Sequence, residues 1–184
     1  AALLVIGAGP AAMAAARGFR SAGGEGPVAL IADEGLPPYR RPLLTKELLR
    51  HECARTDLPL AADAWFADND VRLIMGRAVA LVPGNGSVEL SGGRTLRYER
   101  CVVATGAEPV RLPVPGGDDP GVRTLRSLAD FDEIDRRVAQ DARAVVIGSG
   151  FIGCEIAASL CRRGLGVTLV SDERAPQHDR LGPD

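Results

Sequence analysis

Two glycine-rich segments hold the residues whose types and spacing suggest chemistry. Gly7-x-Gly9-x-x-Ala12 lies near the first residue, and Gly148-x-Gly150-x-x-Gly153 lies near the last. In such a segment the first glycine allows a tight turn, the second admits a diphosphate close to the backbone, and the third position packs helix against strand. The diphosphate binds unpaired N–H groups at the positive helix end. Two such segments predict two dinucleotide sites, and therefore electron transfer between two dinucleotides.

Each segment is flanked by a short apolar strand and an alanine-rich helix. Residues 3–6, 10–20 and 28–32 predict a strand, a helix and a strand, and Pro10 suits the first helical turn. Residues 144–147, 151–163 and 166–170 repeat this order. This β-α-β context gives meaning to a glycine motif that is weak alone.

Between the two β-α-β units the spacing of the apolar residues changes. We expect short helices over 45–51, with Thr45 as N-cap, and over 63–70, with Trp65 and Phe66 in the core. Strands at 71–75, 78–82, 87–90 and 95–98 predict a β-meander, and 100–104 returns as a parallel strand. A Pro- and Gly-rich connection at 107–121 and an amphipathic helix at 127–140 follow.

These elements predict an α/β fold with two Rossmann-like parts. Residues 1–110 form the first segment, a parallel sheet plus a β-meander. Residues 111–142 form a connector with an amphipathic helix, and residues 143–184 begin a second, incomplete Rossmann-like domain.

Acidic residues follow the second strand of each unit. Asp33, with Glu34 beside it, is placed to bind a ribose diol. In the second unit Ser171 and Asp172 occupy the matching place, and Arg174 follows. An acid there favours NADH, whereas serine and arginine tolerate a 2′-phosphate, so NADH is favoured and NADPH stays open.

The composition gives no support for nucleic-acid binding, a membrane segment or a metal site. The net charge of -2 and an aromatic content of 4% give no reason to expect nucleic acid as a partner. No apolar run approaches the ~20 residues that span a bilayer, so no membrane segment is expected. The four cysteines form no Cys-x-x-Cys, which indicates structural thiols in a reducing cytoplasm, and we assign no metal site.

The order of the motifs resembles a known family. Gly7-Ala-Gly9-Pro-Ala-Ala12, Leu36-Pro-Pro-Tyr-Arg-Arg41-Pro-Leu-Leu-Thr-Lys46, Ala104-Thr-Gly106 and Gly148-Ser-Gly150-Phe-Ile-Gly153-Cys-Glu155 occur in sequence. Together they resemble the FAD-dependent NAD(P)H:ferredoxin or rubredoxin reductases of bacterial oxygenase systems, within the pyridine nucleotide-disulfide oxidoreductase superfamily. Apoptosis-inducing factor is a relative. The resemblance covers nearly the whole chain.

The resemblance implies two binding domains and a set of site residues. The first domain would bind FAD and the second NAD(P)H. Lys46, beside the flavin N5, would pair with Glu155, and these two would be catalytic. The residues implied to contact FAD are Gly7, Gly9, Pro10, Ala11, Ala12, Asp33, Glu34, Arg41, Lys46, Val79, Ala104, Thr105, Gly106 and Arg126. Those implied to contact NAD(P)H are Gly148, Gly150, Phe151, Ile152, Gly153, Ser171 and Asp172.

Other interpretations of these residues stay open. Leu43 and Thr45 replace a proline and a serine of the family's Arg-Pro-Pro-Leu-Ser-Lys stretch, and both changes are mild. From composition alone, Arg41 and Lys46 also fit a solvated basic loop. Glu155 also fits stabilisation of a helix N-terminus by its charge.

The implied function is electron transfer from NAD(P)H through FAD to a ferredoxin or rubredoxin. A slow-turnover FAD- and NADH-binding sensor, as in apoptosis-inducing factor, is the alternative. Disulfide reductases require a cysteine pair after the first β-α-β unit, where this chain has Cys53 alone, and the loop at 36–46 does not resemble that of flavin monooxygenases. In the family the FAD domain is completed after the NAD domain, so we expect these 184 residues to be an N-terminal fragment that binds FAD weakly or not at all when alone. The oligomeric state is not predicted.

Overall fold

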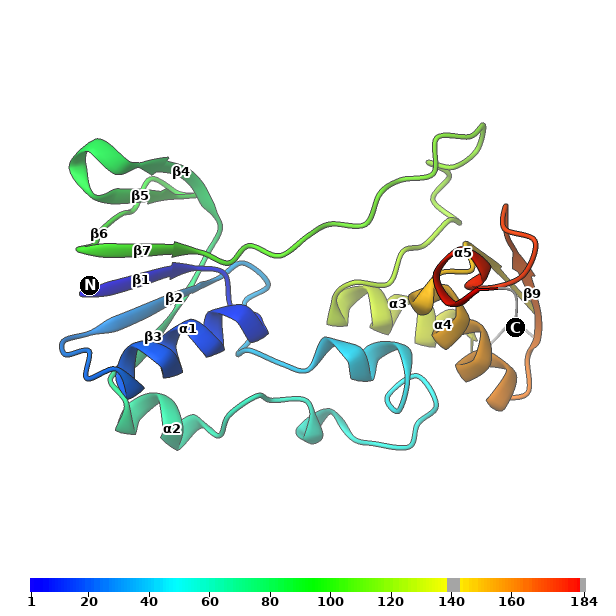
Figure 1. Ribbon diagram of the computed structural model, residues 1–184, viewed down its shortest axis with the longest axis horizontal. Helices are drawn as coiled ribbons and strands as arrows, with labels where there is room; N and C mark the ends of the chain where they lie inside the picture. Colours follow the sequence, from blue (N-terminus) through cyan, green and yellow to red (C-terminus); the bar gives the residue numbers. More distant parts are fainter. Residues whose placement is uncertain (139–142, 183–184) are drawn as a thin grey trace. The chain divides into compact units, whose positions relative to one another are not determined.

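A computed structural model describes residues 1–138 and 143–182. Its contacts divide the chain into two units, drawn in Figure 1. The first contains Ala1–Arg40 and Pro59–Ala107, and the second contains Arg41–Leu58 and Glu108–Asp184. Residues 41–58 therefore group with the later part of the chain, although the sequence analysis placed them in its first segment. The domain bounds at 110 and 142 stay predictions.

The first unit is built on a parallel sheet. Its strands are β1 (Leu3–Ile6), β2 (Val28–Ala32), β3 (Val71–Met75) and β7 (Arg100–Val103), in the order β3-β2-β1-β7. All three strand pairs are parallel. Helix α1 (Pro10–Ser21) connects β1 to β2. The predicted α/β class and the first β-α-β unit are confirmed.

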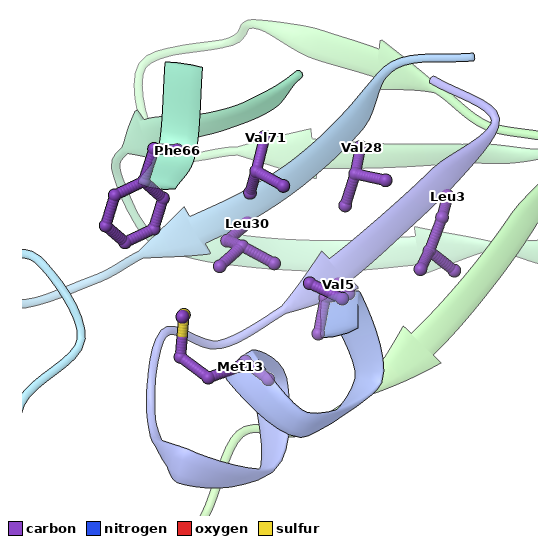
Figure 2. Packing of buried hydrophobic residues seen from close by; sticks show 9 residues of the cluster. Leu3, Val5, Met13, Val28, Leu30, Phe66 and Val71 are labelled. Carbon is purple, nitrogen blue, oxygen red and sulfur yellow. The ribbon is translucent and has the colours of Figure 1, made fainter. Parts of the chain in front are cut away.

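One face of this sheet packs against α1 and α2 (Asp63–Asp68). Figure 2 shows Leu3, Val5, Met13, Val28, Leu30, Phe66 and Val71 meeting in this layer. Ala12 and Ala16 are fully buried on α1, so the helix approaches the strands closely. Phe66 is buried as predicted, and Trp65 packs on it edge to face at 5.3 Å between ring centroids.

The other face is covered by an antiparallel sheet, and here one prediction is wrong. This sheet contains β4 (Ala78–Val82), β5 (Ser87–Leu90) and β6 (Thr95–Arg97), and η3 (Pro83–Asn85) joins β4 to β5. Leu4, Ile31 and Val88 are buried between the layers. Residues 71–75, predicted to begin the β-meander, instead form the edge strand of the parallel sheet beside β2. Only Val71 of this edge strand is buried, so residues 71–75 lack the continuous buried run that is typical of an inner parallel strand.

The second unit contains the second β-α-β unit. Strands β8 (Arg143–Ile147) and β9 (Gly166–Val170) are parallel, and α4 (Phe151–Arg162) connects them, as predicted. Helix α3 (Leu128–Val138) lies within the predicted helix 127–140, whose last two residues lie outside the described ones. A short helix, α5 (His178–Leu181), follows β9. None of the helices described at 1–138 and 143–182 is long and apolar enough to cross a membrane.

Residues 41–58 contain two 3-10 helices, η1 (Arg41–Thr45) and η2 (Arg55–Asp57). The helix predicted over 45–51 is wrong, because η1 ends at Thr45 and turns follow it. Short local hydrogen bonds, such as that from the Arg50 N–H to the Lys46 carbonyl, and buried side chains together hold this segment. Four leucines are buried, namely Leu44, Leu48, Leu49 and Leu58.

Charged contacts join this segment to α3 and to the C-terminal end of α4. The His51 imidazole lies 2.8 Å from the Asp135 carboxylate, and Arg163 lies 2.5 Å from the same oxygen. Arg55 pairs with Asp132. Partial burial alone raises the pKa of Asp135, but hydrogen bonds and charge from His51 and Arg163 outweigh it, so this pKa is lowered.

This lowered pKa links stability to pH. A carboxylate with a lowered pKa stabilises the folded state above its unfolded pKa of about 4, and this contribution disappears as the pH falls through the folded pKa. We expect Asp135→Asn to lower the free energy of unfolding at about pH 5 and the deficit to shrink by about pH 3. Urea unfolding at both pH values measures this, with Asp68→Asn, exposed on α2, as the control. A deficit that is the same at both pH values would contradict the account.

Candidate functional site

The turn after β1 has the geometry of a diphosphate cradle. Gly7 has a φ of +125°, and a Cβ there would lie 2.1 Å from the Ala104 carbonyl oxygen, so only glycine fits. A Cβ on Gly9 would meet no atom within 4 Å. Ala12 is fully buried, and its methyl group fills the contact of helix with sheet. Gly9 therefore presents bare backbone to open space.

The helix that begins at this turn is not capped by a side chain within the described residues. Gly9 is the N-cap of α1, Pro10 stands at its first position, and its first turn contains no acidic residue. The first N–H groups of a helix have no partner within it, and they carry its positive end. These features fit an anionic diphosphate better than a purely structural turn.

Other residues predicted to contact FAD follow β2 and β7 or lie in β4. Asp33 follows β2 and lies 3.3 Å from Arg77 on the exposed surface, while the Tyr39 hydroxyl donates to Glu34 at 2.6 Å. An exposed ion pair of this kind is weak, and the role of Asp33 toward a ribose stays a prediction. The β4–β5 register shifts between Ala78 and Ala80, so Val79 has no paired residue on β5. Ala104 follows β7 beside Gly7, and Thr105 and Gly106 are exposed after it.

The turn after β8 has the same geometry as the turn after β1. The third position of its glycine motif, Gly153, leaves no room even for a methyl group. Gly148 has a φ of +99°, and a Cβ on Gly153 would lie 1.9 Å from the Gly148 carbonyl oxygen. Gly150 is the N-cap of α4, which has no acidic residue in its first turn and, within the described residues, no side-chain cap. Phe151 and Ile152 are more than half exposed at its start. This turn also fits a diphosphate.

Several residues that the sequence analysis did not select lie at this second turn. The Ser149 and Ser171 hydroxyls are 2.5 Å apart, and the Glu173 N–H donates to Ser171 at 3.0 Å. The Gln177 amide donates to the Ser149 carbonyl at 2.6 Å, and the Arg180 guanidinium stacks over the Phe151 ring at 5.5 Å. Ser171 is therefore already engaged, while Asp172 is exposed. No local pattern marks Gln177 or Arg180.

The second unit brings together the charged residues predicted to contact flavin. Lys46 Nζ lies 3.0 Å from Glu155 Oε1, and Arg41 donates to the Arg126 carbonyl at 2.8 Å. Glu155 therefore pairs with a cation from outside its own helix. Their roles toward a flavin stay predictions. The composition also singles out Lys46, because it is the single lysine among the 22 Lys and Arg residues of the sequence.

The cysteines do not form a disulfide-reducing centre. All four are free thiols, and burial followed by the charge of Asp57 raises the pKa of Cys53. Burial likewise raises the pKa of Cys101. A redox-active cysteine needs a lowered pKa, so Cys53 does not fit that role. Across the described residues, no three His, Cys, Asp or Glu side chains gather where they could hold a metal ion.

Comparisons with known proteins agree with this arrangement. A family model described as pyridine nucleotide-disulphide oxidoreductase matches residues 1–182. Rhodocoxin reductase of Rhodococcus erythropolis is 37% identical over 169 residues, which cover 91% of this chain and 40% of that protein. Rubredoxin-NAD(+) reductase of Pseudomonas putida is 33% identical over 177 residues, covering 96% and 46%. The chain thus spans less than half the length of these relatives.

A solved structure gives the same result for the fold. The covalent putidaredoxin reductase–putidaredoxin complex matches with a TM-score of 0.83 and 35% identity, covering 91% of this chain and 41% of that one.

Gly153 and Gly18 differ in the space around them, and this difference predicts different effects on stability when each is replaced by alanine. We expect Gly153→Ala to lower the free energy of unfolding by about 1–3 kcal/mol, because its methyl group has no room against the Gly148 carbonyl. Gly18→Ala is the matched control, since a Cβ there meets nothing within 4 Å and alanine favours the helix by about 0.5–1 kcal/mol. Chemical denaturation of both variants measures the change in the free energy of unfolding at each position. Equal effects at the two positions would show that close packing does not fix the third glycine.

Proposed function

The chain belongs to the pyridine nucleotide-disulphide oxidoreductase family, and we propose that it is the part of a flavoenzyme that passes electrons from NADH through FAD to a ferredoxin or rubredoxin. The observation that carries this proposal is the pair of turns at Gly7 and Gly148. Each begins a helix with no acidic residue in its first turn, and each presents a glycine N-cap. Such turns suit two dinucleotides.

The FAD diphosphate is assigned to the first turn and the NADH diphosphate to the second. Gly9 and Gly150 admit the two diphosphates, and Asp33 accepts hydrogen bonds from the adenosine ribose of FAD. Asp172, exposed after β9, favours NADH over NADPH by repelling a 2′-phosphate. The remaining predicted contacts of Arg41, Val79, Ala104–Gly106 and Arg126 are part of the same proposal.

Lys46 and Arg41 supply positive charge, and Glu155 fixes the position of Lys46. A bound FAD would supply the two-electron chemistry needed to take a hydride from NADH and the one-electron chemistry needed to pass the electrons on singly. Reduced flavin carries negative charge, so a fixed ammonium and guanidinium stabilise it. Glu155 holds the ammonium at 3.0 Å.

The partner is proposed from the relatives. Rubredoxin-NAD(+) reductase and the putidaredoxin reductase complex are named for small electron-carrier proteins, which supports a carrier of that class here. Neither name supports the slow-turnover sensor. A cytoplasmic location is part of the proposal, supported by four free thiols.

Anaerobic mixing tests the function directly. Protein loaded with FAD is mixed with NADH, and the flavin absorbance is followed before and after oxidised ferredoxin or rubredoxin is added. We expect rapid loss of the flavin absorbance and its return with the acceptor. Slow reduction into a long-lived charge-transfer complex, with no return on adding acceptor, would support the sensor instead.

Paired variants assign each dinucleotide to its turn. Gly9→Val places a side chain where it meets no protein atom, so folding costs at most about 1 kcal/mol for the poorer N-cap while FAD affinity falls at least about tenfold. Gly150→Val, where the nearest atom to a Cβ is 3.7 Å away, is expected to weaken NADH and leave FAD unchanged. Equilibrium titration of each variant with each nucleotide measures this. Loss of the wrong nucleotide, or of neither, would refute the assignment.

A further inference from the structure

We propose that Thr45 is a positioning residue of the Lys46–Glu155 pair, and that its hydroxyl sets the orientation of the Glu155 carboxylate and thereby of the Lys46 ammonium. This inference rests on the proposed function, since the pair matters to the reaction only if Lys46 serves the flavin. In this proposal Thr45 acts through Glu155 and Lys46 and not on a reacting group itself. The geometry that supports it lies wholly within the second unit.

The Glu155 carboxylate is divided between two adjacent residues. Its Oε1 lies 3.0 Å from Lys46 Nζ, and its Oε2 accepts from the Thr45 hydroxyl at 2.6 Å. A hydrogen bond to an ionised acceptor is short and strong, and the distance here is typical of that class. With each oxygen held by a different donor, the carboxylate plane cannot turn freely.

The Thr45 hydroxyl has two acceptors and one proton. Besides Glu155 Oε2, the Pro42 carbonyl lies 3.2 Å from Oγ1. The nearer, charged acceptor takes the proton when Glu155 is in place. If Glu155 moves away, the hydroxyl can donate to Pro42, so the buried Thr45 side chain is not left unsatisfied.

The backbone of Thr45 is fixed by the same helix that carries Glu155. The Ser159 hydroxyl donates to the Thr45 carbonyl at 2.7 Å, and both residues are buried. Glu155 and Ser159 are four residues apart on α4, so they lie on one helix face. Arg50 in turn donates to the Ser159 hydroxyl at 3.4 Å. One face of α4 thus holds both the side chain and the main chain of Thr45.

The identity of residue 46 explains why such positioning is needed. An ammonium on a four-carbon stem is a mobile point charge, whereas a guanidinium is a rigid fork. This chain uses arginine for every other permanent cation and lysine only here. The Lys46 side chain is 40% exposed, so burial does not restrain it. The Lys46 ammonium is therefore fixed by the Glu155 carboxylate, which Thr45 holds in turn.

The test compares Thr45→Val, which removes the hydroxyl but keeps the shape, with Thr45→Ser, which keeps the hydroxyl. Thr95→Val, exposed on β6, is the matched control. The first readout needs no flavin: in protein labelled with ¹⁵N-lysine, the Lys46 NH₃⁺ signal is assigned by its loss in Lys46→Arg, and its hydrogen exchange is measured. The second readout is the rate of flavin reduction by NADH, measured apart from the Kd of NADH.

We expect Thr45→Val to speed Lys46 exchange and slow flavin reduction, each by at least about tenfold, since a hydrogen bond to a charged group is lost. The Kd of NADH stays unchanged, and Thr45→Ser and Thr95→Val behave as the parent. Unchanged exchange in Thr45→Val overturns the proposal. If Thr45→Val does not fold, fast exchange in Thr45→Ser overturns it equally. If the parent protein shows slow exchange but no flavin reduction, the proposed function fails while the control of Lys46 by Thr45 stands.

Discussion

Two places where the backbone cannot carry a Cβ govern what this molecule can bind. At Gly7 the added atom would strike the Ala104 carbonyl, and at Gly153 it would strike the Gly148 carbonyl. The Gly153 contact packs α4 closely onto the turn after β8, whereas the Gly7 contact brings the turn before α1 against the end of β7, and each helix has a glycine N-cap. The helix N–H groups are then left for a ligand in place of a side chain. A diphosphate is the dinucleotide group best matched to such a surface.

The segment at 41–58 is the second constraint, because it belongs by its contacts to elements far along the chain. Its leucines are buried, and its charged residues meet α3 and α4 through Asp132, Asp135 and Glu155. As a result Lys46, Arg41 and Arg126 are ordered within the same unit as the second glycine turn. The unit that would bind the hydride donor therefore also carries the cations proposed to stabilise reduced flavin.

The sequence predicts regular elements well where local rules decide. Both glycine turns, both β-α-β units and the burial of Phe66 follow from strand–turn–helix patterns and small residues. It fails where distant partners decide. Residues 71–75 pair with β2 instead of joining the meander, because an edge strand is largely exposed in either sheet and its local pattern does not name its partner. Thr45 was expected to cap a helix, but its partner Glu155 lies 110 residues away. His51 likewise meets Asp135 across 84 residues, which no local pattern reveals.

The claim that each turn holds its own dinucleotide is tested most directly by simultaneous binding. Equilibrium dialysis of the full-length protein against saturating FAD and NADH together, with each nucleotide quantified, gives the two stoichiometries and shows whether they compete. The account predicts one FAD and one NADH per chain, with neither displacing the other. Mutual displacement from a single site, or binding of only one of the two, would contradict it.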